Sequence, residues 1–132
     1  TTLATMINYV NETAPVHIVT AYNPAGIELD DETNISRHRS LGIAVAGRNV
    51  LPTVGSAPDG SMPEPGFALL EGTLGDALEL AREFGQLAIY QWTPEALNII
   101  DVDETFRRRL GWSLSEHRKS AVTRAVGPRR SG

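Results

Sequence analysis

The two side chains best suited to chemistry in this sequence are Arg37 and Glu64. Glu64 stands between Pro63 and Pro65, which hold it in an extended segment with few conformations, as a general base or a fixed hydrogen-bond acceptor requires. Arg37 falls on the predicted inward face of a helix, where its planar guanidinium suits a carboxylate or a phosphate. The alternatives are a solvated Glu64 in a proline-rich loop and a structural ion pair between the two side chains. We take both as candidate catalytic residues, with Glu64 as the base and Arg37 as the charge stabiliser.

Four more polar side chains are predicted to gather at the same end of the sheet: Thr20, Asn23, Asn34 and Gln86. Asn23 precedes Pro24 at the stop of a β-branched strand, and Gln86 follows the glycine that ends a helix. Amide and hydroxyl groups at element ends can hydrogen-bond a polar ligand. They can equally serve the backbone, since Asn in a turn often caps its own chain and Gln after a helix often satisfies carbonyl groups. We take the four as candidate ligand-binding residues.

The sequence lacks the residues that metal binding, phosphate-loop nucleotide binding and covalent serine catalysis need. The sequence has no cysteine, and His17, His38 and His117 have no second ligand at a metal-binding spacing, so neither a metal site nor a cofactor is expected. His17 is expected to point outward on its strand. The glycines between residues 55 and 60 are not followed by the lysine of a phosphate-binding loop, and no serine has the context of a nucleophile elbow.

The lengths of the apolar runs also indicate in which cellular compartment the protein is expected. The longest apolar runs fall well short of the roughly 20 residues that a membrane span needs. The first residues lack the basic and then apolar pattern of an export signal, and the absence of cysteine is compatible with a reducing compartment. We therefore expect a cytoplasmic protein without membrane contact.

The spacing of hydrophobic residues along the first hundred positions predicts helices and strands. One helix is predicted from a cap at Asp30 or Asp31 to about Ala46, and a second follows the capping box of Thr73 and Asp76 and ends at Gly85. A short amphipathic helix is also expected near the start of the chain, over residues 2–11. The first predicted strand starts at Val16 and stops at Asn23-Pro24. The others cover residues 49–54, 67–71, 87–92 and 97–102, and the last two form a hairpin.

The resulting order, β-α-β-β-α-β-β, predicts an α+β fold of the split βαβ type, an antiparallel-rich sheet with two helices packed on one face. A chain of 132 residues, 41% of them hydrophobic, suffices for one core and not for two. We place this single domain at residues 1–103. The Gly- and Pro-rich connection over residues 55–66 is longer than a hairpin needs, as in loops that act as lids.

Charge divides the chain into two regions. Residues 1–103 carry four arginines against fourteen acidic residues, a net charge of −10, whereas residues 104–132 carry eight basic residues against two acidic ones, a net charge of +6. We expect residues 104–132 to form a basic C-terminal tail with a short helix from Ser115 to Ala125, and residues 1–103 to fold without it. The tail is either solvated or, over residues 107–130, a handle for a partner protein or nucleic acid.

A set of short motifs resembles a known family. These motifs are Thr20-Ala21-Tyr22-Asn23-Pro24, Asn34 with Arg37 and Leu41, Gly55 before a loop carrying Glu64, and Phe84-Gly85-Gln86 with Ala88. In this order and spacing they are similar to the small bacterial proteins catalogued as the DUF3293 domain of unknown function. The resemblance covers roughly residues 16–102 and implies no activity, so the site hypotheses rest on the residues themselves.

Two classes of function follow. In the first, the six candidate residues bind a small polar or anionic ligand, for instance a nucleotide-like one, at one end of the sheet; whether catalysis accompanies binding is left open. In the second, the same residues are structural and the protein is a non-enzymatic regulatory module, like an antitoxin, that binds a protein or nucleic acid. A ribonuclease that uses Glu64, Arg37 and His38 without a metal is a third and more remote hypothesis.

Overall fold

Seven strands and two α-helices make up the part of the chain that the computed structural model describes, which is residues 15–56, 64–103, 107–117 and 120–128. Side chains are described for residues 15–55 and 64–103. Along the chain the elements are β1 (Val16–Thr20), a 3₁₀ turn η1 (Pro24–Gly26), α2 (Asp31–Ala44), β2 (Val50–Ser56), β3 (Glu64–Leu69), α3 (Leu74–Glu83), β4 (Ala88–Trp92), β5 (Leu97–Asp101), β6 (Arg107–His117) and β7 (Ser120–Pro128).

Both helices begin at the caps that the sequence predicts. The Asp30 side chain accepts a hydrogen bond from the Thr33 backbone N–H at 2.7 Å, which satisfies one of the free donors at the start of α2. At the start of α3, Thr73 and Asp76 form the reciprocal capping box. The predicted helix over residues 2–11, and most of the connection predicted as a lid, lie outside the described residues.

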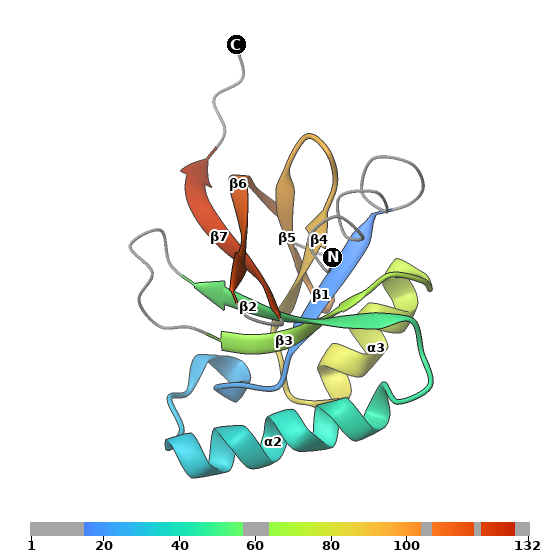
Figure 1. Ribbon diagram of the computed structural model, residues 1–132, viewed down its shortest axis with the longest axis vertical. Coiled ribbons are helices and arrows are strands. Elements are labelled where there is room, and N and C mark those ends of the chain that lie inside the picture. The colour runs from blue at the N-terminus through green and yellow to red at the C-terminus, as the bar shows by residue number, and fades with distance from the viewer. Residues whose placement is uncertain (1–14, 57–63, 104–106, 118–119, 129–132) are drawn as a thin grey trace.

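The strands close into a barrel in the order β1-β3-β2-β7-β6-β5-β4 (Figure 1). Neighbouring strands are antiparallel except β2 and β7, which run parallel. The α+β class, the antiparallel pairing and the order β-α-β-β-α-β-β are confirmed. The sheet differs from an open split βαβ sheet because β6 and β7 bridge its two edges, β5 and β2.

The short helix predicted from Ser115 to Ala125 is wrong, since this segment lies in β6 and β7. Without these strands β2 and β5 would present rows of unpaired backbone groups, and pairing with them outweighs a weak local preference for helix. Leu110 of β6 lies opposite Leu97, and Ala121 of β7 lies opposite Thr53. The basic segment therefore belongs, over its described part, to the same sheet as the strands that precede it.

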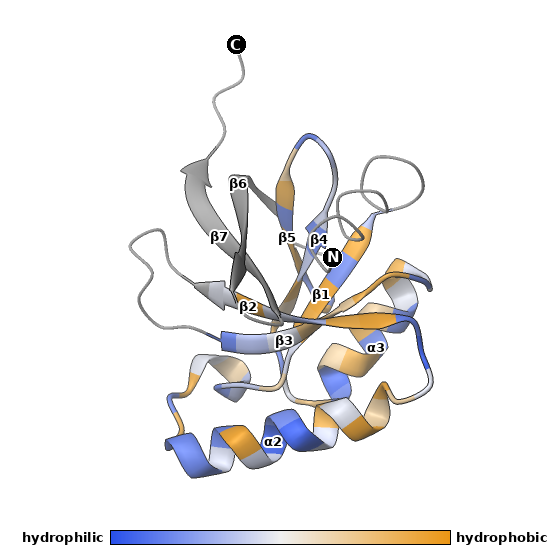
Figure 2. Cartoon of the chain, viewed as in Figure 1, coloured by the Kyte–Doolittle hydropathy of each residue, from blue (hydrophilic) through white to orange (hydrophobic). Residues whose placement is uncertain are grey.

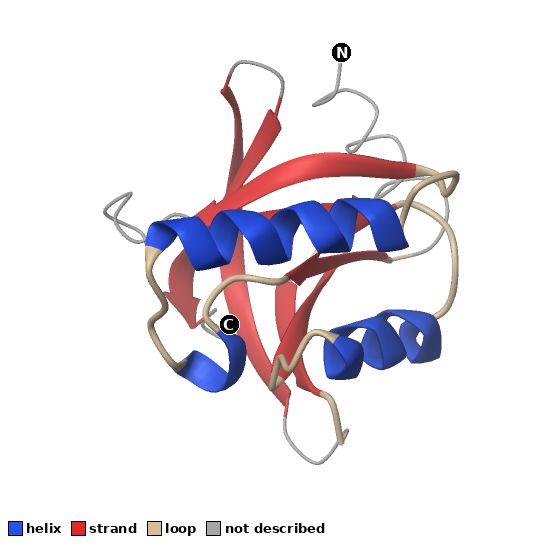
Figure 3. Ribbon diagram, turned by 90° about the horizontal axis from the view of Figure 1, so that it is seen from below, coloured by secondary structure: helices blue, strands red, loops and turns tan. Residues whose placement is uncertain are grey.

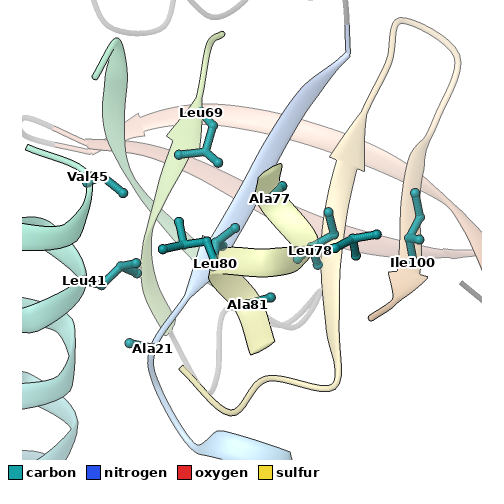
Figure 4. Packing of buried hydrophobic residues seen from close by; sticks show 11 residues of the cluster. Ala21, Leu41, Val45, Leu69, Ala77, Leu78, Leu80, Ala81 and Ile100 are labelled. Carbon is teal, nitrogen blue, oxygen red and sulfur yellow. The ribbon is translucent and has the colours of Figure 1, made fainter. Parts of the chain in front are cut away.

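The helices pack on one side of this barrel (Figure 3). α3 contacts β1 and β4, and α2 contacts β3. The alternation of strand residues divides the buried hydrophobic side chains into two clusters. The helix-side cluster, part of which Figure 4 shows, joins both helices to the strands through residues such as Val19, Leu41, Leu78 and Ile100. The second cluster lies on the opposite faces of the strands and includes Val16, Ile18, Ala68, Trp92 and Leu97.

His17 interrupts the hydrophobic residues of β1 (Figure 2). It alternates to the same side of β1 as Val19, where the helices pack, and it is only 4% exposed, so the expectation that it points outward from the protein is wrong. Its Nε2 lies 3.3 Å from Nε2 of Gln91 on the neighbouring strand. Burial lowers the pKa of the His17 imidazole, which favours the neutral form.

Candidate functional site

The turn that follows β1 has an unusual backbone. Asn23 and Ala25 both have positive φ angles, 47° and 55°, although neither is glycine. The left-handed region is disfavoured for residues with a Cβ, more so for Ala than for Asn. Such a turn persists only when its surroundings hold it, and residues of α2 and of the segment that follows α3 supply these contacts.

Asn34 holds the turn from the first part of α2. Its side chain is 3% exposed, and its Oδ1 accepts from the Asn23 backbone N–H at 3.0 Å. Its Nδ2 donates to Oδ1 of Asn23 at 2.8 Å and to the Leu29 carbonyl at 3.3 Å. Oδ1 of Asn23 also accepts from the Leu29 backbone N–H at 3.0 Å. The two amides thus fold the segment between them into a closed loop.

Arg37, one turn further along α2, joins the same turn to the end of α3. Its Nε donates to the Ala21 carbonyl at 2.7 Å, and its Nη2 donates to the Phe84 carbonyl. Next along the chain from Phe84, the Gly85 carbonyl accepts from the Ala25 backbone N–H at 2.9 Å, and Gln86 donates to the Tyr22 carbonyl at 3.0 Å. Arg37 is half-buried, and no carboxylate pairs with its guanidinium among the described side chains.

Thr20 connects the turn to the start of β3. Its Oγ1 donates to the Pro65 carbonyl at 2.7 Å and accepts from the Tyr22 backbone N–H at 3.1 Å. β1 comes so close here that a Cβ on Gly66 would lie 2.5 Å from the Val19 carbonyl oxygen, so only glycine fits.

Glu64 is the first residue of β3, next to Pro65. Its side chain is half-buried, and within the described part of the chain it has no hydrogen-bond or ion-pair partner. Burial raises the pKa of the Glu64 carboxyl. The structural ion pair with Arg37 that the sequence left open as an alternative is therefore absent.

An aromatic group that was not predicted from the sequence lies beside the turn. His38, which follows Arg37 on α2, stacks on Phe67 of β3 with ring centroids 5.0 Å apart and an angle of 5° between the planes. Tyr22 meets His38 edge-on at 6.2 Å and 71°. Nδ1 of His38 is buried and has no hydrogen-bond partner among the described residues, and burial lowers the pKa of this imidazole. The available signal was the place of His38 on the inward stripe of α2, beside Arg37 and Leu41.

The structure thus brings five of the six candidates together around the turn: Thr20, Asn23, Asn34, Arg37 and Gln86. Glu64 adjoins them through the bond from Thr20 to Pro65. Most of the hydrogen bonds that these five side chains make within the described part of the chain go to the backbone, as the structural alternatives for Asn23 and Gln86 required. Whether the six residues also bind a ligand stays a prediction.

The described residues contain no group of three or more His, Cys, Asp or Glu side chains that could hold a metal ion. Nor do they include a helix long and apolar enough to cross a membrane.

The fold and the site define a small α+β barrel whose first turn, residues 21–29 (the polar turn), is held by polar side chains of β1, of α2 and of the segment that follows α3. Residues 19–89 match the family described as a protein of unknown function (DUF3293), and the chain belongs to that family. The matched region contains the whole polar turn, Glu64 and the aromatic group, and it ends before β5, β6 and β7. Searches of curated proteins and of solved structures found no significant match.

Proposed function

We propose that the domain binds a small polar or anionic ligand where β1, β3 and α2 meet, with Arg37 as the charged anchor. The observation that carries this proposal is the half-buried guanidinium without a carboxylate partner among the described side chains. A partly desolvated charge is costly unless it is compensated, and two neutral carbonyls compensate it only in part. An anionic ligand group would complete the pairing.

The geometry of Arg37 favours a planar or phosphate-like anion. A guanidinium has five N–H donors, and the Ala21 and Phe84 carbonyls occupy one donor each on Nε and Nη2. The remaining donors form part of a rigid fork that suits carboxylate and phosphate oxygens. Because the two carbonyls fix the side chain beforehand, little rotamer entropy would be lost on binding.

The half-buried rings of Tyr22 and His38 adjoin the residues that hold Arg37. A ligand that joins a planar ring to a phosphate would match this neighbourhood, which supports a nucleotide-like anion as the ligand class. Glu64 is the candidate general base, since its pKa is raised toward neutrality and its carboxyl has no described partner. Catalysis with Arg37 and Glu64 is part of the proposal. We also propose that the protein is bacterial and that it is located in the cytoplasm. Fractionation of cells that contain it would test the location.

Thermal unfolding with two defined probes, inorganic phosphate and AMP at 10 mM, tests the proposed ligand class. A ligand that binds only the folded state raises the melting temperature according to its affinity. We expect AMP to raise it more than phosphate does, and Arg37→Gln to abolish both shifts. Arg39→Gln, a charge change at an exposed position of the same helix, should retain them. Equal shifts in both variants, or no shift in the unmodified chain, would reject Arg37 as the anchor.

The second hypothesis, a non-enzymatic interaction module, has a different observation in its favour, the basic residues of β6 and β7. The two hypotheses use different residues, because β6 and β7 lie outside the polar turn.

A further inference from the structure

The basic residues of the C-terminal region have defined positions on the barrel. β6 begins with Arg107, Arg108 and Arg109, and β7 carries Arg124. The register sets Arg107 opposite Ile100 and Arg109 opposite Asn98. Arg124 lies opposite Ser113 on β6 and Ser56 on β2.

Residues directly opposite one another in neighbouring strands share a face of the sheet. Ile100 belongs to the helix-side cluster, beside Leu78 in Figure 4, so the positions of Arg107 and Arg109 share the outer face of the barrel. Thr53 alternates with Val54 and shares the face of Leu51, which packs on the second cluster. Since Ala121 is opposite Thr53, Arg124 falls on the outer face as well.

Neither of the two described helices covers this outer face of β6 and β7. α2 and α3 lie on the far side of the barrel from β6 and β7 (Figure 1), and their main contacts are with β1, β3 and β4. The same face carries Ser113, opposite Arg124, and Ser115, opposite Val122. The sequence up to residue 103, in contrast, has a net charge of −10.

We propose that the outer face of β6 and β7 binds nucleic acid through its phosphate backbone, independently of any ligand at the polar turn. Charge complementarity selects a polyanion, because a positive face on an otherwise acidic molecule orients a negatively charged partner toward it and away from the rest. Around the arginine positions this face carries serine at 113 and 115 and valine at 122, and its one ring-bearing position, His117, lies at the far end of β6 from Arg107 and Arg109, so the described positions form no stacking platform for bases. Binding is therefore by phosphate contacts and varies little with sequence.

Fluorescence anisotropy of the full chain with a labelled 20-nucleotide DNA, single-stranded and as a duplex, tests this. Three arginine contacts correspond to a slope of about −2.7 for log affinity against log salt on duplex, or an affinity loss of about 40-fold between 50 and 200 mM. We expect Arg107→Ser/Arg109→Ser to reduce the slope by about two, and the exposed pair Arg39→Ser/Arg48→Ser to leave it unchanged. Circular dichroism melts check that each variant folds.

Arg124 lies on the other strand, β7, so Arg124→Ser tests the proposal even if the double variant fails to fold. This single change should reduce the slope of log affinity against log salt by about one. The proposal is overturned if neither DNA binds at 50 mM salt, or if both arginine variants bind like the unmodified chain. It is also overturned if light scattering shows a salt-sensitive dimer while the anisotropy stays flat, because the arginines would then serve the acidic surface of a second copy.

Discussion

At the scale of single residues, the polar turn depends on very few side chains. The Asn34 side chain bonds the Asn23 backbone N–H, the Leu29 carbonyl and Oδ1 of Asn23, which the Leu29 backbone N–H also reaches. Buried polar groups are expensive to leave without partners, so the loss of one amide affects several atoms at once.

Asn34→Ala should therefore lower the free energy of unfolding by about 1 to 3 kcal/mol, because it strands these groups. Urea denaturation followed by circular dichroism measures the change. Ser40→Ala, at an exposed position of the same helix, is the matched control and should change it by less than about 0.5 kcal/mol. An Asn34 variant as stable as the control would mean that water replaces the amide without cost.

Glu64 gives a pH-dependent prediction. Burial raises the pKa of its carboxyl in the folded state above the ordinary 4.5, so the charged form disfavours folding. Its contribution to stability is complete below pH 4.5 and is lost as the pH rises through the folded-state value. Glu64→Gln should thus be more stable than the unmodified chain at pH 7, and the two should converge below pH 4.5.

Denaturation midpoints at several pH values measure this difference, with the exposed Glu79→Gln as control. A Glu64→Gln variant that is less stable at pH 7 would show that the carboxylate has a compensating partner. Greater stability without the native carboxylate is typical of a residue kept for function.

At the scale of elements, one close approach between β1 and β3 makes a sharp prediction. Gly66→Ala places a Cβ 2.5 Å from the Val19 carbonyl oxygen, a backbone atom that cannot move aside cheaply. We expect a loss of about 1 to 3 kcal/mol. Gly75→Ala, whose Cβ would meet only Oγ1 of Thr73 at 3.6 Å, should instead be neutral or stabilising by up to about 1 kcal/mol. Opposite signs in the urea midpoints are the expected result.

The elements before residue 103 follow from local patterns. α3 was predictable because Thr73 and Asp76 cap it and Ala77, Leu78 and Ala81 form its buried stripe. α2 was predictable from Asp30 and from the spacing of Asn34, Leu41 and Val45. The gathering of the candidate residues at the end of β1 was also foreseen, since it depends on element order.

The remaining features depend on contacts between distant parts of the chain. Nothing local marks Arg107–His117 and Ser120–Pro128 as strands, because the pairing that closes the barrel joins β7 to β2, whose residues lie far earlier in the sequence. The stack of His38 on Phe67 likewise needs the crossing of α2 over β3. The hydrogen bonds from Arg37 to the Ala21 and Phe84 carbonyls were also not predictable. The position of Arg37 on the inward face of a helix suits a ligand as well as a structural partner.

At the scale of the whole molecule, the barrel is closed by β6 and β7. A chain ending at residue 103 would lose both strands and leave the edges of β2 and β5 unpaired. We now expect this truncation to abolish cooperative unfolding and to promote association through the open edges, contrary to the expectation from the sequence. Thermal melts and light scattering of the truncated chain measure both effects. A sharp transition in a monomer would show that the five remaining strands suffice.

The parallel pairing of β2 with β7 also governs how the protein is made. Thr53 leaves the ribosome long before Ala121, the residue that will lie beside it. Translation proceeds at roughly 5 to 20 residues per second, whereas a hairpin such as β4 and β5 forms within microseconds. During synthesis the nascent chain therefore holds a half-built sheet for several seconds, with two hydrogen-bonding edges facing the crowded cell. Binding by a chaperone at this stage would protect it until β7 emerges.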